Sequence, residues 1–383
     1  MSVYLDYNSS APIDERVVDC MVGVYRNTIG NADSRTHDFG NHAREVTEDA
    51  RAQVAELLGV QKNEVFFTSG ATESNNIALQ GLRDYAVETG KKHIITSSIE
   101  HKAVLETAKH LAKEGFEVEF VSPDTSGRVS AQEILDKVRP DTLVVSLMHV
   151  NIETGIIQPV LEVGKALEKK GVLFHIDATQ SFGKLVDELR ECKYDMLSMS
   201  AHKLRGPQGV GALILRRKNY KLPPVKNIMY GGQQEHGIRP GTIPVALVAG
   251  LGKACAIAGT EYRNNALKCT TIKERILSLL EESGVAYKII GDQTYCVSGT
   301  LNVCFLGVSA EALMISTKQY CGISNGSACN SNSYSPSHVL IAMSIPKDEI
   351  ESCVRFSWGA GADPEAVVES VNELLQVAKS LAF

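Results

Sequence analysis

Three short stretches of the sequence hold side chains that could together bind a charged cofactor. Residues 68–75 place Ser and Thr hydroxyls around a Gly just before a helical pattern, and free N–H groups at a helix start bind phosphate. Residues 175–180 place Asp177 at the end of an apolar strand pattern, where ligands of α/β proteins bind. Residues 200–207 place Lys203 beside a His and before a Gly-Pro turn, and lysine is the side chain that forms Schiff bases.

Each stretch has an ordinary structural explanation when it is taken alone. The first could be a Gly turn with a Thr helix cap, Asp177 could cap a helix, and Lys203 could lie in an exposed turn. The combination matches what pyridoxal phosphate (PLP) requires, because the carboxylate pairs with the protonated ring nitrogen and the lysine holds the aldehyde. Burial would lower the pKa of such a lysine and free its amine. We therefore predict PLP as the cofactor.

A fourth stretch, residues 324–333, surrounds Cys329 with small and polar residues. A thiol in such a loop is a candidate nucleophile, because it is accessible and the chain around it can move. The other eight cysteines are typical of small core residues. The total of nine, with no paired spacing and no C-x-x-C, indicates neither a disulfide framework nor a zinc site. We expect a reducing, cytoplasmic setting and no bound metal.

Composition limits the kinds of protein that this chain can be. Hydrophobic residues make up 44% of its 383 residues, enough to bury a core, so disorder is not its main state. Its 39 Lys and Arg residues against 45 Asp and Glu give a net charge of −6, which argues against a direct nucleic-acid partner. No apolar run approaches the roughly 18–20 residues that span a bilayer, and the first residues show no signal-peptide pattern, so we expect no membrane partner.

Short β-branched runs alternate with helical patterns from residue 64 onward. The predicted strands cover 64–68, 93–97, 117–122, 143–149, 172–177, 196–200 and 210–215, with helices over 72–88, 101–114, 130–138 and 159–170 between them. Such alternation predicts an α/β fold with a large, mostly parallel sheet covered on both faces. A long helical pattern at about 242–282, with Gly259 as a possible break, leads into a smaller α+β unit. We predict a large domain at 15–258 and a small domain formed by 1–14 and 259–383.

The chain resembles the PLP-dependent cysteine desulfurases of aminotransferase class V, in the subgroup with a long cysteine loop. The matching stretches are residues 4–8, 68–75, 100–104, 177–181, 200–211, 241–242, 326–329 and 354–357. The loop cysteine makes the match specific, because it separates these enzymes from other PLP enzymes. The resemblance implies a type I PLP fold, an obligate homodimer, and conversion of L-cysteine to L-alanine with a persulfide left on Cys329.

The resemblance also implies a role for each matching side chain. Lys203 would hold the cofactor, Asp177 would pair with its ring nitrogen, and His101 would stack on the ring and shuttle protons. The other cofactor contacts would come from Gln180 at the ring hydroxyl, and from Ala71, Thr72, Ser200, His202 and the partner subunit's Thr242 at the phosphate. The substrate carboxylate would be bound by the fork of Arg355, helped by Asn31 and Asn151.

Several positions depart from the pattern of this family. Ile152 stands where an Asn usually contacts the ring hydroxyl, and Ala32 replaces a Pro after the Gly-Asn pair. His236 stands where Arg is common, and Trp358 stands where an aliphatic residue is more usual. These differences affect the tuning of the ring rather than the class of reaction.

The predicted function is that of a cysteine desulfurase that passes sulfur from Cys329 to an acceptor protein. The acceptor could serve iron–sulfur assembly, tRNA thiolation or DNA phosphorothioation. One alternative is a selenocysteine lyase or another PLP lyase. The other is a catalytically inactive scaffold in a sulfur-transfer complex, although the presence of Lys203, Asp177, Cys329 and Arg355 together argues against it.

Overall fold

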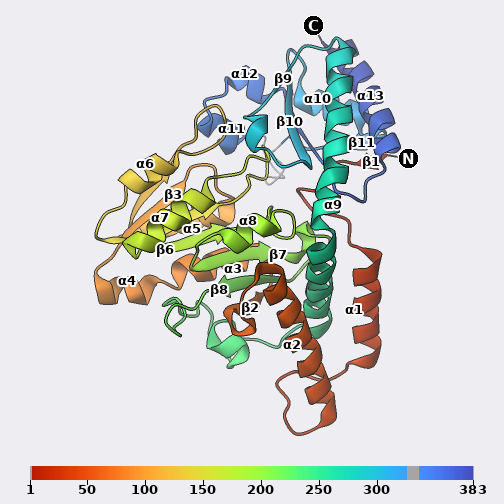
Figure 1. Ribbon diagram of the computed structural model, residues 1–383. Helices are drawn as coiled ribbons and strands as arrows, with labels where there is room; N and C mark the ends of the chain where they lie inside the picture. The colour runs from red at the N-terminus through yellow and green to blue at the C-terminus, as the bar shows by residue number, and fades with distance from the viewer. Residues whose placement is uncertain (1, 326–335, 383) are drawn as a thin grey trace.

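The computed structural model describes residues 2–325 and 336–382. Two layered units are joined by one long helix (Figure 1). The larger unit is a seven-stranded sheet with helices on both faces, and the smaller unit is built on a three-stranded antiparallel sheet. Both chain ends lie beside the smaller unit.

The seven-stranded sheet has the order β2-β8-β7-β6-β5-β3-β4. Its strands are β2 (Val65–Thr68), β3 (His93–Ser97), β4 (Glu117–Val121), β5 (Thr142–Met148), β6 (Leu173–Asp177), β7 (Met196–Ser200) and β8 (Gly211–Leu215). β8 runs antiparallel to both of its neighbours, β2 and β7, and the other neighbouring pairs of this sheet are parallel. The prediction of a mostly parallel α/β sheet is therefore confirmed.

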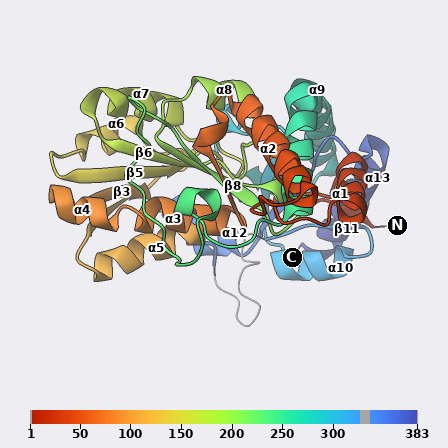
Figure 2. The same cartoon turned by 90° about the horizontal axis from the view of Figure 1, so that it is seen from below.

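Helices cover both faces of this sheet (Figure 2). One face is covered by α2 (Asp38–Leu58), α6 (Ala131–Asp136), α7 (Val160–Lys170) and α8 (Val186–Glu191), and the other by α3 (Ala71–Gln80), α4 (Arg83–Thr89) and α5 (Lys102–Lys113). Successive strand residues enter opposite cores: Phe67 packs on the first face and Phe66 on the second. This alternation, with both faces buried, explains why the strands read as continuous apolar runs.

The helix predicted over 72–88 is divided at Gly81. A Cβ atom there would lie 2.4 Å from the carbonyl oxygen of Ile77 and 2.5 Å from that of Lys226. The Gly81 carbonyl also accepts a hydrogen bond of 2.8 Å from the Lys226 amide. The close passage of a distant loop therefore ends α3, and α4 begins at Arg83.

The smaller unit contains the antiparallel strands β9 (Tyr287–Ile289), β10 (Thr300–Phe305) and β12 (Cys353–Ser357). A separate parallel pair joins β1 (Val3–Tyr4) to β11 (Cys321–Gly322), which ties the N-terminal segment to this unit. Its helices are α10 (Ala310–Thr317), α11 (His338–Ala342), α12 (Lys347–Ile350) and α13 (Pro364–Leu381). Short 3₁₀ turns lie at η1 (Lys62–Glu64), η2 (Ala201–Lys203), η3 (Gln234–Gly237) and η4 (Gln293–Tyr295).

The helix α9 (Val245–Ser283) runs without a break through Gly259, where the sequence suggested one. Its first half packs with α1 (Glu15–Asn27) and α2 against the larger core, and its second half packs in the core of the smaller unit. A Cβ at Gly252 would lie 2.6 Å from the Cα of Ala50, so glycine permits the close crossing of α2 and α9. No helix in the described residues is long and apolar enough to cross a membrane.

Candidate active site

A cavity of about 400 Å³ lies at the carboxyl ends of the central strands. It is lined by Ala71, Thr72, His101, Ile152, Asp177, Gln180, Ser200, His202 and Lys203, together with neighbouring residues. Residues from five separate parts of the sequence thus meet at one edge of the sheet, where parallel strands place their ligands. The structure brings together every predicted cofactor residue except Thr242.

The turn from β2 into α3 forms one wall of the cavity. Gly70 precedes the helix with φ +152° and ψ −179°, a backbone conformation that is essentially restricted to glycine. Ala71 and Thr72 begin α3, so their N–H groups have no partner within the helix. The side chain of Glu73 accepts a hydrogen bond from the Ser69 amide and pairs with Arg239 at 2.9 Å, which fixes the turn.

Asp177 ends β6 and is 5% exposed. One carboxylate oxygen accepts a hydrogen bond of 2.8 Å from the Asn75 side chain, and the other accepts from the amide of Thr179 at 2.9 Å and from its hydroxyl. These donors are all neutral, so within the described residues the buried carboxylate has no ion pair. A buried carboxylate of this kind favours a cationic ligand in the cavity.

Lys203 lies in the η2 turn after β7 and is 8% exposed. Its ammonium donates hydrogen bonds of 2.6 Å to the carbonyl oxygens of Asn8 and Ser9. Burial is the main cause that lowers the pKa of Lys203 to about 8, because the charged form is poorly solvated inside the protein. A neutral amine is therefore far more accessible here than on an exposed lysine.

Two histidines border the same cavity and favour the neutral form. His101 caps α5, and its Nδ1 accepts a hydrogen bond of 3.1 Å from the Ala103 amide. Burial lowers the pKa of His101, and burial followed by the nearby Lys203 lowers the pKa of His202 to about 4. Both rings are consequently uncharged at neutral pH. Gln180 lines the same cavity, and its amide donates to the Asn8 carbonyl at 2.9 Å.

The predicted substrate residues are not gathered in this cavity. Arg355, on β12, is 4% exposed, forms an ion pair with Asp6, and donates to the Ile152 carbonyl at 3.2 Å. The oxygen of the Asn151 side chain accepts from Glu153 and Thr154, so it holds the turn 151–154. Outside the cavity, Asn31 and Thr242 are exposed. Cys329 lies outside the described residues.

Three contributors were not predicted as site residues. Asn75 binds Asp177, the Asn8 carbonyl binds both Lys203 and Gln180, and Asp6 holds Arg355. Each lies inside a stretch that matches the family pattern, residues 4–8 or 68–75, which was the available signal. Residue type alone did not reveal them, because two act through neighbouring side chains and Asn8 acts through its backbone.

The structure shows the contacts or burial of each position that departs from the family pattern. Ile152 lines the cavity, and its carbonyl accepts a hydrogen bond from Arg355. Trp358 is 3% exposed and donates to the Cys269 carbonyl at 3.1 Å. Ala32 is buried, and the His236 ring lies edge-on to Phe66 at 6.1 Å. Of these four residues, Ile152 alone lines the cavity.

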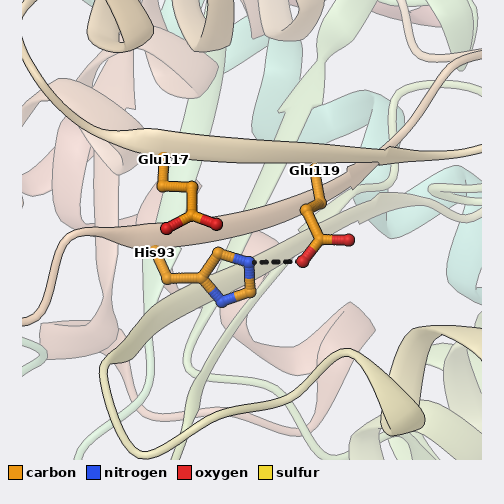
Figure 3. A group of neighbouring side chains, drawn as sticks. All are labelled: His93, Glu117 and Glu119. Atoms are coloured by element: carbon orange, nitrogen blue, oxygen red, sulfur yellow. Dashed lines mark hydrogen bonds and ion pairs between the residues drawn. The ribbon is translucent and has the colours of Figure 1, made fainter.

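One cluster elsewhere has the residue types of a metal site. His93 on β3 faces Glu117 and Glu119 on β4, and its ring lies 3.2 Å from Glu119 (Figure 3). Glu117 is already paired with Arg139, and Glu119 with Lys137 at 2.7 Å. These cations cancel the charge that would attract a metal ion, so we assign no metal site here.

The residues around the cavity fit PLP. The α3 N-terminus offers N–H groups for a phosphate, the buried Asp177 lacks a cationic partner, and Lys203 has an amine of low pKa. Comparison with known proteins agrees: residues 3–369 match the family model of aminotransferase class V. The chain belongs to this family, whose cofactor is PLP.

Within this family, the chain is similar to curated cysteine desulfurases and to several solved structures. The cysteine desulfurase IscS of Anaeromyxobacter dehalogenans strain 2CP-C is 41% identical over 95% of this chain and 89% of its own length. The cysteine desulfurase IscS of Enterobacter sp. strain 638 is 40% identical over 96% of this chain and 90% of its own length. A NifS-like protein superposes with a TM-score of 0.91 at 35% identity, with both chains fully covered. DndA from Streptomyces lividans superposes with a TM-score of 0.81 at 42% identity, and the superposition covers 90% of this chain and 96% of DndA.

Proposed function

We propose that this protein is a PLP-dependent cysteine desulfurase that converts L-cysteine to L-alanine and carries the sulfur as a persulfide on Cys329. The observation that supports it best is that the buried Lys203 and the buried Asp177 line one cavity at the strand ends. The relatives named cysteine desulfurase, and a solved relative titled SspA in complex with cysteine, support the choice of substrate. The latter is 34% identical, with a TM-score of 0.81 over 93% of this chain and 98% of SspA.

When bound, PLP supplies an electron sink for the carbons next to the substrate amine. Asp177 would hold the ring nitrogen in its protonated form, and Gln180 and His101 would contact the ring. The phosphate would be held by Ala71, Thr72, Ser200 and His202. Lys203 would be the covalent anchor and would move the proton of the substrate Cα. With a pKa near 8, about one Lys203 amine in ten is neutral at pH 7, against roughly one in 3,000 for an exposed lysine.

Sulfur leaves the substrate by attack of the Cys329 thiolate on the substrate sulfur. One S–S bond forms, and the bond between the substrate Cβ and sulfur breaks. The carbon fragment keeps the electron pair and takes up a proton to become alanine, so no external oxidant is needed. Thiolate is the reactive form, because it is a far better nucleophile than the thiol.

Arg355 is the proposed anchor of the substrate carboxylate. Its Nε has no hydrogen-bond partner among the described residues, and its ion pair with Asp6 holds the fork in place. The incoming carboxylate would compete with Asp6 for this fork. Asn31 and Asn151 remain proposed helpers in binding the substrate carboxylate. The Asn151 side chain accepts a hydrogen bond from the Glu153 amide and so holds the turn whose Ile152 carbonyl accepts a hydrogen bond from Arg355.

A homodimer is part of the proposal. The segment before α2, the first turn of α2 and the loop before α9 expose large apolar side chains, namely Ile29 at 77%, Phe39 at 61% and Tyr230 at 94% respectively. Exposed apolar side chains of this size favour contact with another chain. Thr242 lies in the same loop before α9. If this loop contacts the partner subunit, Thr242 could contact the partner's phosphate site, as the resemblance implies. Light scattering of the purified protein should give twice the chain mass of 41.5 kDa, and a monomer would refute the dimer.

The remaining proposals concern organisation and destination. We propose that residues 15–258 form the large domain and that 1–14 with 259–383 form the small one, in a cytoplasmic protein. The sulfur would pass to an acceptor protein of iron–sulfur assembly, tRNA thiolation or DNA phosphorothioation. Isolation of a mixed disulfide between Cys329 and a bound protein, after cysteine is added to a cell extract, would identify the acceptor.

The deciding experiment measures alanine and sulfide from L-cysteine with the PLP-loaded protein. We expect turnover by the natural sequence and almost none by Cys329→Ala or Lys203→Ala, with Cys20→Ala as a matched cysteine control. A Cys329→Ala variant that still releases selenium from selenocysteine would favour a selenocysteine lyase. Absence of turnover in the natural protein, with PLP fully bound, would favour the scaffold.

A further inference from the structure

Lys184 is a half-buried lysine to which the proposed function gives no task. It follows β6 in a turn where Gly183 has φ +74°, and it lines a second cavity of about 130 Å³. Lys203 lines this cavity too, so the two lysines share one wall behind the active site. Within the described residues Lys184 forms no ion pair, and Asp14 and the Cys269 thiol, whose pKa burial raises to about 11, also line this cavity.

A short chain of polar contacts connects the two lysines. The Lys184 ammonium lies 3.5 Å from the side-chain oxygen of Gln180, at the long end of a hydrogen bond. The amide nitrogen of Gln180 then donates to the Asn8 carbonyl at 2.9 Å, and the Lys203 ammonium donates to the same carbonyl at 2.6 Å. A cation beside the oxygen end of Gln180 favours the orientation in which its NH₂ group points toward Asn8 and the cavity.

We propose that Lys184 is a positioning residue for the active site, which fixes the Gln180 amide and, as a like charge beside Lys203, favours the neutral amine of Lys203. Its importance for catalysis rests on the proposed function, but its effect on Lys203 does not. Lys184 itself lies away from the reacting atoms, since it lines only the second cavity.

The charges around Lys203 support this role. After burial, Lys184 is the largest cause that lowers the pKa of Lys203, followed by Arg355 on β12. Asp6, near the N-terminus, and Asp177 on β6 act in the opposite direction. His202 is neutral, so it adds no charge at this point. Burial also lowers the pKa of Lys184 to about 8, so the two amines lose their protons in the same pH range.

The test is competitive labelling of the full-length protein after its PLP has been removed with hydroxylamine. A trace amount of an amine-acetylating reagent is added between pH 6 and 10, and mass spectrometry measures the rate at Lys203. Lys184→Gln should move the titration midpoint of Lys203 upward, so that its labelling at pH 7.5 becomes about threefold slower or more. The variant should fold, because it removes a half-buried charge and shortens the side chain by only one heavy atom.

Matched variants separate charge from packing. Lys184→Arg keeps the charge and should leave the midpoint near that of the natural protein, while Lys165→Gln, on the exposed side of α7, should have no effect. An unchanged or lowered midpoint in Lys184→Gln would overturn the proposal, as would an equal shift in Lys184→Arg. If Lys184→Gln did not fold, Lys184→Met would be measured by the same criteria. Absence of alanine production would refute the proposed function but would not move this midpoint.

Discussion

Glu235→Gln is expected to destabilise the protein more than any change of an exposed ion pair. The Glu235 side chain is 1% exposed and forms two hydrogen bonds of 2.8 Å to Arg51 on α2. It also accepts the Phe67 amide on β2 at 2.7 Å. Glu235 has φ +48°, a conformation that costs energy for a non-glycine residue, so these contacts hold a strained loop against the sheet.

The expected loss in the free energy of unfolding depends on which buried groups lose their partners in Glu235→Gln. Glutamine keeps one acceptor oxygen but places an NH₂ group against donors, so Arg51 becomes a buried and poorly compensated charge. Breaking a buried ion pair in this way costs about 3–5 kcal/mol. Glu48 still lies 3.0 Å from the Arg51 Nε, so we expect the lower end, about 3 kcal/mol. In a chain of this size that corresponds to roughly a 4 °C fall in Tm.

The assay is thermal unfolding of the PLP-free protein by calorimetry, because cofactor binding would add its own stabilisation. Glu48→Gln is the matched control: its side chain is 44% exposed, and such a pair is worth less than about 1 kcal/mol. A Glu235→Gln variant that melts within about 1 °C of the natural protein would refute the reasoning, as would an equal loss in Glu48→Gln.

Three further predictions test the cavity. Folding lowers the Lys203 pKa from 10.5 to about 8, so the unfolded chain binds more protons between pH 8 and 10.5 and the stability of the natural protein rises with pH in that window. The stability of Lys203→Met relative to the natural protein should therefore fall by about 2 kcal/mol from pH 7 to 10. Urea unfolding at several pH values measures this difference, and a difference that stays constant would contradict the shifted pKa. Gly70→Ala should weaken PLP binding in equilibrium dialysis roughly tenfold through backbone strain, whereas Gly90→Ala, with φ +70° and open surroundings, should not. Ile152→Asn adds an amide donor to the cavity wall and should move the absorbance titration of the PLP-loaded protein to lower pH by about one unit or less; an unchanged midpoint would mean that position 152 does not face the ring hydroxyl.

Much of the large unit was predictable because its signals are local. Continuous apolar runs of strand length, separated by helical patterns, predict a parallel sheet without any knowledge of contacts. The stop of α3 at Gly81 was not predictable, because it depends on a loop more than 140 residues away that packs on that glycine. The two N-terminal helices, α1 and α2, were likewise not predicted, since they depend on contacts with α9.

The sequence by itself determined the chemistry. Residues 68–75, Asp177 and Lys203 are specific as types, and their positions at strand ends place them on one edge of the sheet. The tertiary structure decided their environment: it buried Lys203, gave Asp177 the amide of Asn75, brought Asn8 under Lys203 and Gln180, and placed Lys184 behind them. The physical reason is that desolvation and the field of distant charges depend on which segments pack together, and no local pattern in the sequence encodes that packing.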